Sequence, residues 1–150
     1  MRDFFAEVYR NKILMTTISA WLIAQTIKVA IGVFQKRKFD FRLFIGSGGM
    51  PSAHAAGAAC LGTSIGLQCG FDSVYFALAF AFAVVVMFDA QGVRRSTGKQ
   101  AGILNKIMDD IYWKKKIKET RLRELIGHTP VEVIMGLLLG IAIALVSWIK

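Results

Sequence analysis

The sequence contains only two cysteines, two prolines and two histidines among its 150 residues. Cys60 and Cys69 lie nine positions apart in one apolar segment, where helix geometry forbids a disulfide between them. Their spacing matches no metal-binding motif, so the sequence excludes both a disulfide framework and a cysteine metal centre. We expect both cysteines to be small packing residues.

Charged residues are sparse in four long apolar runs, at 13–34, 51–70, 73–90 and 131–149. Apolar residues make up 55% of the chain, and each run approaches the roughly 20 residues that cross a bilayer as a helix. No short apolar core ends at a small-residue cleavage site, so we expect no cleavable signal peptide. The pattern predicts one all-α domain over 1–150, an integral membrane bundle of about four transmembrane helices plus a cytoplasmic amphipathic helix.

Basic residues are concentrated on one predicted side of the membrane. Fourteen of the nineteen lysines and arginines fall there: Lys36, Arg37, Lys38, Arg42, Arg94, Arg95, Lys99, Lys106, Lys114, Lys115, Lys116, Lys118, Arg121 and Arg123. The positive-inside rule assigns that side to the cytoplasm. Within the insertion at 91–127, Leu104, Ile107, Met108 and Ile111 recur at helical spacing before a lysine run, which favours a helix lying on an anionic leaflet. The membrane surface explains these charges without a nucleic-acid partner.

The stretch from Gly46 to His54 (Gly-Ser-Gly-Gly-Met-Pro-Ser-Ala-His) combines a glycine-rich loop with a predicted helix start at Pro51. Unpaired N–H groups of a first helical turn, with those of Gly49 and its neighbours, form a natural anion site. Ser52 adds a hydroxyl and His54 an acid/base group. A helix cap beside a loop explains this stretch equally well.

Three further cations are candidates for holding a phosphate. Lys28 lies within the first apolar run and shares a helix face with Gln25, and a lysine at that depth needs an anion or must snorkel to the surface. Arg94 and Arg95 follow the third run and can clamp phosphate oxygens in a bidentate manner. They also fit the alternative of ordinary charges flanking a transmembrane helix.

His128 and Glu132 are four residues apart at the start of the last apolar run. On a helix, this spacing lets the carboxylate reach the imidazole, which fixes the tautomer and leaves the other ring nitrogen able to attack or abstract. The alternative for a lone histidine at a membrane interface is a polar anchor. Both histidines of the chain nevertheless fall on the predicted cytoplasmic side, together with Lys28.

Two of these stretches carry short motifs. Gly49–His54 looks like the Pro-Ser-Gly-His signature of the type 2 phosphatidic acid phosphatase and vanadium haloperoxidase superfamily, and His128–Gly136 resembles its closing motif. Residues 89–95 (Asp-Ala-Gln-Gly-Val-Arg-Arg), with Gly98–Ala101 after them, are similar to a divergent branch of small bacterial and plastid membrane proteins. The resemblance therefore implies a bacterial inner or plasma membrane, or a plastid-type membrane.

The resemblance also implies roles for individual residues, in a phosphatase that uses no metal and no cofactor. His128 would be the nucleophile that forms a phosphohistidine, Glu132 would orient it, and His54 would protonate the leaving oxygen and then activate water. The phosphate oxygens would be held by a group of polar and basic residues: Gly49, Ser52, Arg94 or Arg95, and Lys28 or Arg42.

The chain departs from the superfamily pattern in four ways. Glu132 stands where the family usually has aspartate, and Arg95 lies 33 positions before His128 rather than a few. The opening Lys…Arg-Pro motif is not recognisable, so Lys28 or Arg42 is the expected replacement. Four spans are fewer than the six typical of the membrane enzymes, which leaves room for a homodimer to complete the fold.

These observations predict an integral membrane lipid phosphatase with its active site facing the cytoplasm. The expected substrate is an anionic lipid: phosphatidate, phosphatidylglycerophosphate or an isoprenyl phosphate. The alternative is a non-enzymatic membrane protein that binds or transports phospholipid or phosphate through the same anion site. A haloperoxidase is disfavoured, because nothing in the sequence indicates a soluble fold that handles peroxide.

Overall fold

The computed structural model describes residues 2–36, 49–91, 100, 102–105, 107–108 and 128–149. Over these residues the chain is helical and contains no strand. The five principal helices are α1 (Arg2–Arg10), α2 (Lys12–Lys36), α4 (Ala53–Cys69), α5 (Val74–Gln91) and α7 (Pro130–Trp148). Arg42, Arg94 and Arg95 lie outside the described residues, as does most of the insertion at 91–127, so the cytoplasmic amphipathic helix stays a prediction.

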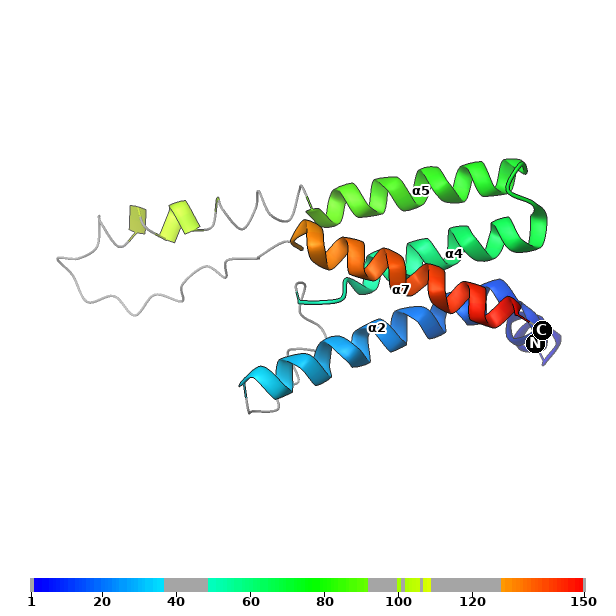
Figure 1. The fold of residues 1–150 in the computed structure, drawn as a ribbon, viewed down its shortest axis with the longest axis horizontal. Helices are drawn as coiled ribbons and strands as arrows, with labels where there is room; N and C mark the ends of the chain where they lie inside the picture. The colour runs from blue at the N-terminus through cyan, green and yellow to red at the C-terminus, as the bar shows by residue number, and fades with distance from the viewer. Residues whose placement is uncertain are drawn as a thin grey trace.

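Helix α4 is the centre of the bundle and packs against α2, α5 and α7 (Figure 1). The end of α2, the start of α4, the end of α5 and the start of α7 all lie at one end of the bundle (Figure 1). Both chain termini and the turn between α4 and α5 lie at the opposite end (Figure 1). This arrangement agrees with the predicted alternation of the chain between two sides of a membrane.

Three helices are long and apolar enough to cross a membrane: Lys12–Phe34 within α2, Val74–Gln91 and Pro130–Trp148. Helix α4 was expected to be a fourth span over 51–70, but it has 17 residues, fewer than the roughly 20 that cross a bilayer. That α4 crosses the membrane as a fourth span therefore stays a prediction. Its position between the other helices covers most of its surface, so its alanines and glycines pack against protein.

Helix α7 crosses α4 at very short range because both helices present small residues there. A Cβ atom added at Gly136 would collide with the carbonyl oxygen of Ser52, and one added at Gly140 would collide with that of Ala56. The same Cβ atoms would lie 3.0 Å from the side chains of Ala55 and Ala59, respectively. Glycines four apart on an apolar helix permit this kind of backbone approach in a bilayer.

Helix α2 packs against α4 through alanines and also contacts α7. Ala20 lies in a buried cluster with Cys60 and Ala144, and Ala24 lies in another with α4 residues. Both cysteines are free thiols. Cys60 is buried as expected for a packing residue, and its Sγ donates a hydrogen bond to the carbonyl oxygen of Thr16 at 3.6 Å. Cys69 is exposed at the end of α4, so the prediction that it packs in the bundle is wrong.

The predicted helix start at Pro51 is wrong by two residues. Helix α4 begins at Ala53, and Ser52 is its N-cap, with an extended backbone and a hydroxyl oxygen that accepts a hydrogen bond from the Ala55 N–H. The Met50–Pro51 peptide bond is cis. Serine is a preferred N-cap, and here its hydroxyl determines the start of the helix in place of the proline ring.

Replacing Gly140 by alanine should lower the thermal unfolding temperature in detergent, because the new Cβ meets a backbone carbonyl that cannot move aside. We expect a loss of about 1–3 kcal/mol, the range typical of overpacked interiors. The matched control is Gly62→Ala, since a Cβ at Gly62 has no neighbour within 4 Å among the described residues. Equal unfolding temperatures for the two variants would contradict the close α4–α7 crossing.

Candidate active site

Backbone hydrogen bonds connect three helix ends at one end of the bundle. The Ser52 N–H donates to the Glu132 carbonyl oxygen at 3.0 Å, which ties the start of α4 to the first turn of α7. The His128 N–H donates to the Ala90 carbonyl oxygen at 3.1 Å, which ties the residue ahead of α7 to the end of α5. The main chain of His128 is therefore held in place independently of its side chain.

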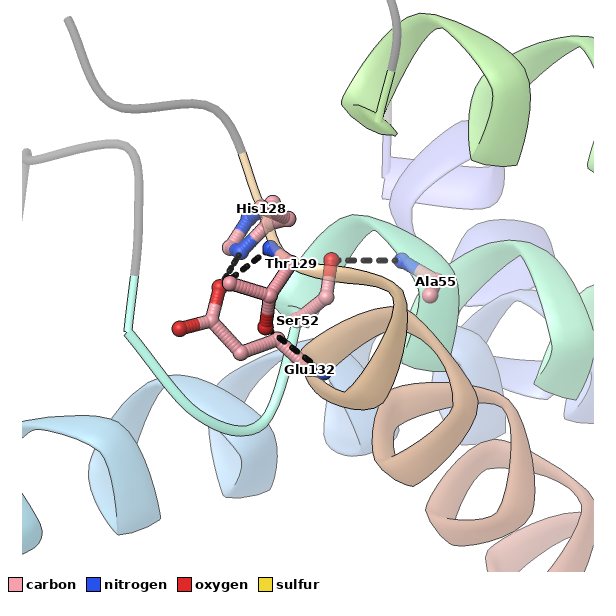
Figure 2. Close-up of polar contacts among 5 residues, drawn as sticks. All are labelled: Ser52, Ala55, His128, Thr129 and Glu132. Atoms are coloured by element: carbon pink, nitrogen blue, oxygen red, sulfur yellow. Dashed lines mark hydrogen bonds and ion pairs between the residues drawn. The ribbon is translucent and has the colours of Figure 1, made fainter. Parts of the chain in front are cut away.

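Helix α7 begins with a capping box. The Thr129 hydroxyl accepts a hydrogen bond from the Glu132 N–H at 3.4 Å, and the Glu132 carboxylate accepts one from the Thr129 N–H at 3.1 Å (Figure 2). Pro130 occupies the first turn, where its missing N–H costs no hydrogen bond. These local preferences place the Glu132 side chain back over the residues that precede the helix.

The carboxylate oxygen that caps the helix also holds the imidazole. Glu132 Oε2 lies 3.0 Å from His128 Nδ1, and the His128 side chain is only 2% exposed (Figure 2). A carboxylate can only accept, so Nδ1 carries the hydrogen, and in the neutral imidazole Nε2 then has the free lone pair. The predicted contact is present, but it arises because His128 directly precedes the N-cap and not because it lies within a helical turn.

The two polar residues predicted at the start of α4 differ in exposure. Ser52 is fully buried, and its hydroxyl caps α4. His54 lies in the first turn of α4 with an exposed side chain. Because the Ser52 N–H is bonded to Glu132, this N–H is no longer available to the predicted anion site.

Lys28 is a buried cation that α2 brings to this end of the bundle. Its side chain is 8% exposed, and the neighbouring Gln25 is buried as well. Gly49 lies directly against it with φ +88°, so that a Cβ there would come within 3.1 Å of Lys28 Cγ. The charge of Lys28 lies within electrostatic range of the Glu132 carboxylate.

A family model described as "Divergent PAP2 family" matches residues 9–143 of the chain. The chain belongs to the Divergent PAP2 family. It is also 41% identical over 151 residues to "Uncharacterized membrane protein YuiD" of Bacillus subtilis (strain 168). The aligned region covers 93% of this chain and 96% of that protein. No solved structure gives a significant match. Together with the three long apolar helices, these findings confirm the predicted resemblance and support a membrane location.

In this divergent PAP2 chain, Gly49 contacts Lys28, and Glu132 contacts both Ser52 and His128. His54 follows Ser52 by two residues in the first turn of α4, and the predicted roles of these residues stay predictions. The three predicted phosphate-binding arginines, Arg42, Arg94 and Arg95, lie outside the described residues. Within the described part of the chain, no group of three histidine, cysteine, aspartate or glutamate residues is arranged to hold a metal ion.

Sequence analysis missed two contributors to the site. Thr129 begins a Thr-x-x-Glu pattern, which is the signature of a capping box, so its role was detectable from sequence. The Ala90 carbonyl, which receives the His128 N–H, carries no sequence signal because it is a main-chain group whose use depends on tertiary packing.

Replacing Thr129 by alanine should destabilise the protein by about 0.5–2 kcal/mol, as the loss of an N-cap does elsewhere. Glu132→Asp should have a comparable effect, because the shorter side chain cannot reach Thr129 N and His128 Nδ1 together. Thermal unfolding in detergent measures both losses.

Thr26→Ala is the matched control for these two variants, since Thr26 is exposed on α2 and its hydroxyl donates a hydrogen bond to the Leu22 carbonyl of the same helix. We expect a change within about 0.5 kcal/mol for this control. A Thr129→Ala protein as stable as Thr26→Ala would show that the capping box contributes little.

Proposed function

We propose that this divergent PAP2 protein is a metal-independent lipid phosphatase that works through a phosphohistidine on His128. The observation that carries the proposal is the 3.0 Å contact between His128 Nδ1 and Glu132 Oε2. In the neutral ring, a carboxylate on Nδ1 selects the tautomer whose Nε2 can attack, and it stabilises the positive charge that the ring acquires on attack. Membership of the Divergent PAP2 family supports the reaction class. The resemblance of His128–Gly136 to the closing motif of the superfamily supports it as well.

In the first step, His128 Nε2 attacks the phosphorus atom, and the bond from phosphorus to the lipid oxygen breaks. His54 gives its proton to that leaving oxygen, so the lipid departs as an alcohol. In the second step, water attacks the phosphohistidine while His54 accepts a proton from it, and inorganic phosphate is released. Glu132 accepts the Nδ1–H hydrogen bond throughout.

The phosphate oxygens need donors in both steps. We propose that main-chain N–H groups of the Gly49 segment and the predicted cations, Arg42 and Arg94 or Arg95, supply them. Lys28 is the buried cation in the described part of this end of the bundle, and its charge adds to the positive potential there. Ser52 contributes by capping α4, which keeps the segment before it in place.

The proposed substrate is an anionic membrane lipid such as phosphatidate, phosphatidylglycerophosphate or an isoprenyl phosphate. The candidate site lies at the ends of helices that are long enough to cross a bilayer, which is the depth at which lipid headgroups lie. A lipid can therefore place its phosphate in the site while its acyl or isoprenyl chains stay in the membrane.

The purified protein should release phosphate from at least one of these lipids in detergent with a metal chelator present. His128→Ala should abolish release, and His54→Ala should lower it by about 10²–10⁴-fold, the contribution of a general acid. A colorimetric phosphate assay on each lipid measures both effects. Full activity in either variant would contradict the mechanism. Absence of release with vanadate still bound would favour the binding or transport function instead.

We also propose that the active-site end faces the cytoplasm, because most basic residues of the sequence fall on that side. The exposed Cys69 at the end of α4 then faces the outside and should react with a membrane-impermeant maleimide in intact spheroplasts. Cys60 is fully buried, so Cys69→Ser should remove the labelling. Labelling that appears only after permeabilisation would reverse the orientation.

A further inference from the structure

Lys28 is a buried cation on a helix that is long enough to cross a membrane. A charged side chain inside such a bundle is costly unless an anion compensates it. Lys28 is 8% exposed, so it does not reach far into solvent to satisfy its charge. The anion that compensates it is therefore to be found among the groups packed around it.

The segment 49–52 contacts Lys28 at its first residue and Glu132 at its last. On one side, the Cα of Gly49 leaves no room beside the lysine stem, because a Cβ there would be 3.1 Å from Lys28 Cγ and 3.3 Å from Cδ. On the other side, the Ser52 N–H binds the Glu132 carbonyl oxygen at 3.0 Å. The lysine from α2 and the glutamate from α7 thus flank the same four residues.

The two oxygens of the Glu132 carboxylate have different surroundings. Oε2 accepts from both Thr129 N and His128 Nδ1, at 3.1 and 3.0 Å. Oε1 takes part in neither bond and points away from both residues (Figure 2). The Lys28 charge interacts with the Glu132 carboxylate. Helix α2 therefore supplies a cation to a carboxylate whose Oε2 already accepts two hydrogen bonds.

We infer that Lys28 is a positioning residue that acts through Glu132. Lys28 of α2, Glu132 of α7 and His128 then form one electrostatic and hydrogen-bonding network. This inference rests on the proposed phosphatase function and deepens it. It assigns Lys28 a role different from the phosphate-binding one that the sequence predicted.

The role follows from the electrostatics of a dry bundle. Burying a carboxylate without a cation has a high desolvation free energy in such a bundle. Charge interactions are strong there because the effective dielectric constant is low. Lys28 supplies a positive charge near the Glu132 carboxylate, which accepts the His128 Nδ1–H. It also offsets the negative charge of Glu132 when a phosphate approaches, so that the orienting group does not repel the substrate.

The test compares Lys28→Met, which keeps the stem and removes the charge, with Lys28→Arg, which keeps the charge. We expect Lys28→Met to lower kcat about tenfold or more, to change KM less than about threefold, and Lys28→Arg to recover most of the lost rate. Lys12→Met is the matched control on the same helix, because Lys12 lies 4.2 Å from the Trp148 ring centroid at the opposite end of the bundle. Its activity should equal that of the wild type.

A second measurement, independent of activity, is a double-mutant cycle of Lys28→Met and Glu132→Gln followed by unfolding temperature. If the two side chains interact, the drop in the double variant will be smaller than the sum of the two single drops. Lys28→Gln replaces Lys28→Met in both tests if the methionine variant does not fold.

The outcomes separate the inference from the proposed function. A raised KM with kcat retained, or additive drops in unfolding temperature, would overturn the inference and return Lys28 to the role of a phosphate ligand. No hydrolysis by the wild-type protein would overturn the proposed function, and the double-mutant cycle would then decide on the Lys28–Glu132 interaction by itself.

Discussion

The close crossing of α7 over α4 is the constraint on which the rest of the structure depends. Gly136 and Gly140 have no Cβ atoms, so their helix can approach the carbonyl oxygens of Ser52 and Ala56. At that distance the Ser52 N–H meets the Glu132 carbonyl oxygen. Packing of small residues therefore sets the position of the polar site, as expected in a bilayer, where apolar burial gives helices little reason to associate.

One carboxylate links local helix chemistry to the proposed reaction. Glu132 Oε2 closes the capping box of α7 and also accepts the His128 Nδ1–H, so one oxygen serves both hydrogen bonds. Glutamate, rather than the aspartate usual in the superfamily, has the length to reach back to the N-cap and to the residue before it. The departure that the sequence presented is thus accounted for by geometry, because the acid lies three residues after the cap it closes.

Much of the bundle was predictable because apolar runs of suitable length with few charges are a strong local signal. The run at 131–149 agrees with α7 to within one residue at each end, and the first run lies inside α2. The start of α4 was not predictable from Pro51, since the Ser52 hydroxyl competed for the cap.

The candidate site was only partly predictable, because its contacts differ in how local they are. The His128–Glu132 contact followed from a spacing of four residues, although by a different local geometry. The contact of Gly49 with Lys28 and the hydrogen bond from His128 N–H to the Ala90 carbonyl join segments far apart in sequence. Such pairings depend on tertiary packing and cannot be predicted from one sequence.

The most direct test of the account is to trap the covalent intermediate. The protein is mixed with a phosphate-labelled lipid, quenched within one turnover, and digested for mass spectrometry under alkaline conditions that preserve phosphohistidine. The account predicts an acid-labile phosphate on His128 that is absent from the His128→Ala protein. Phosphate on any other residue, or hydrolysis with no labelled protein at any quench time, would contradict the central role given to the His128–Glu132 pair.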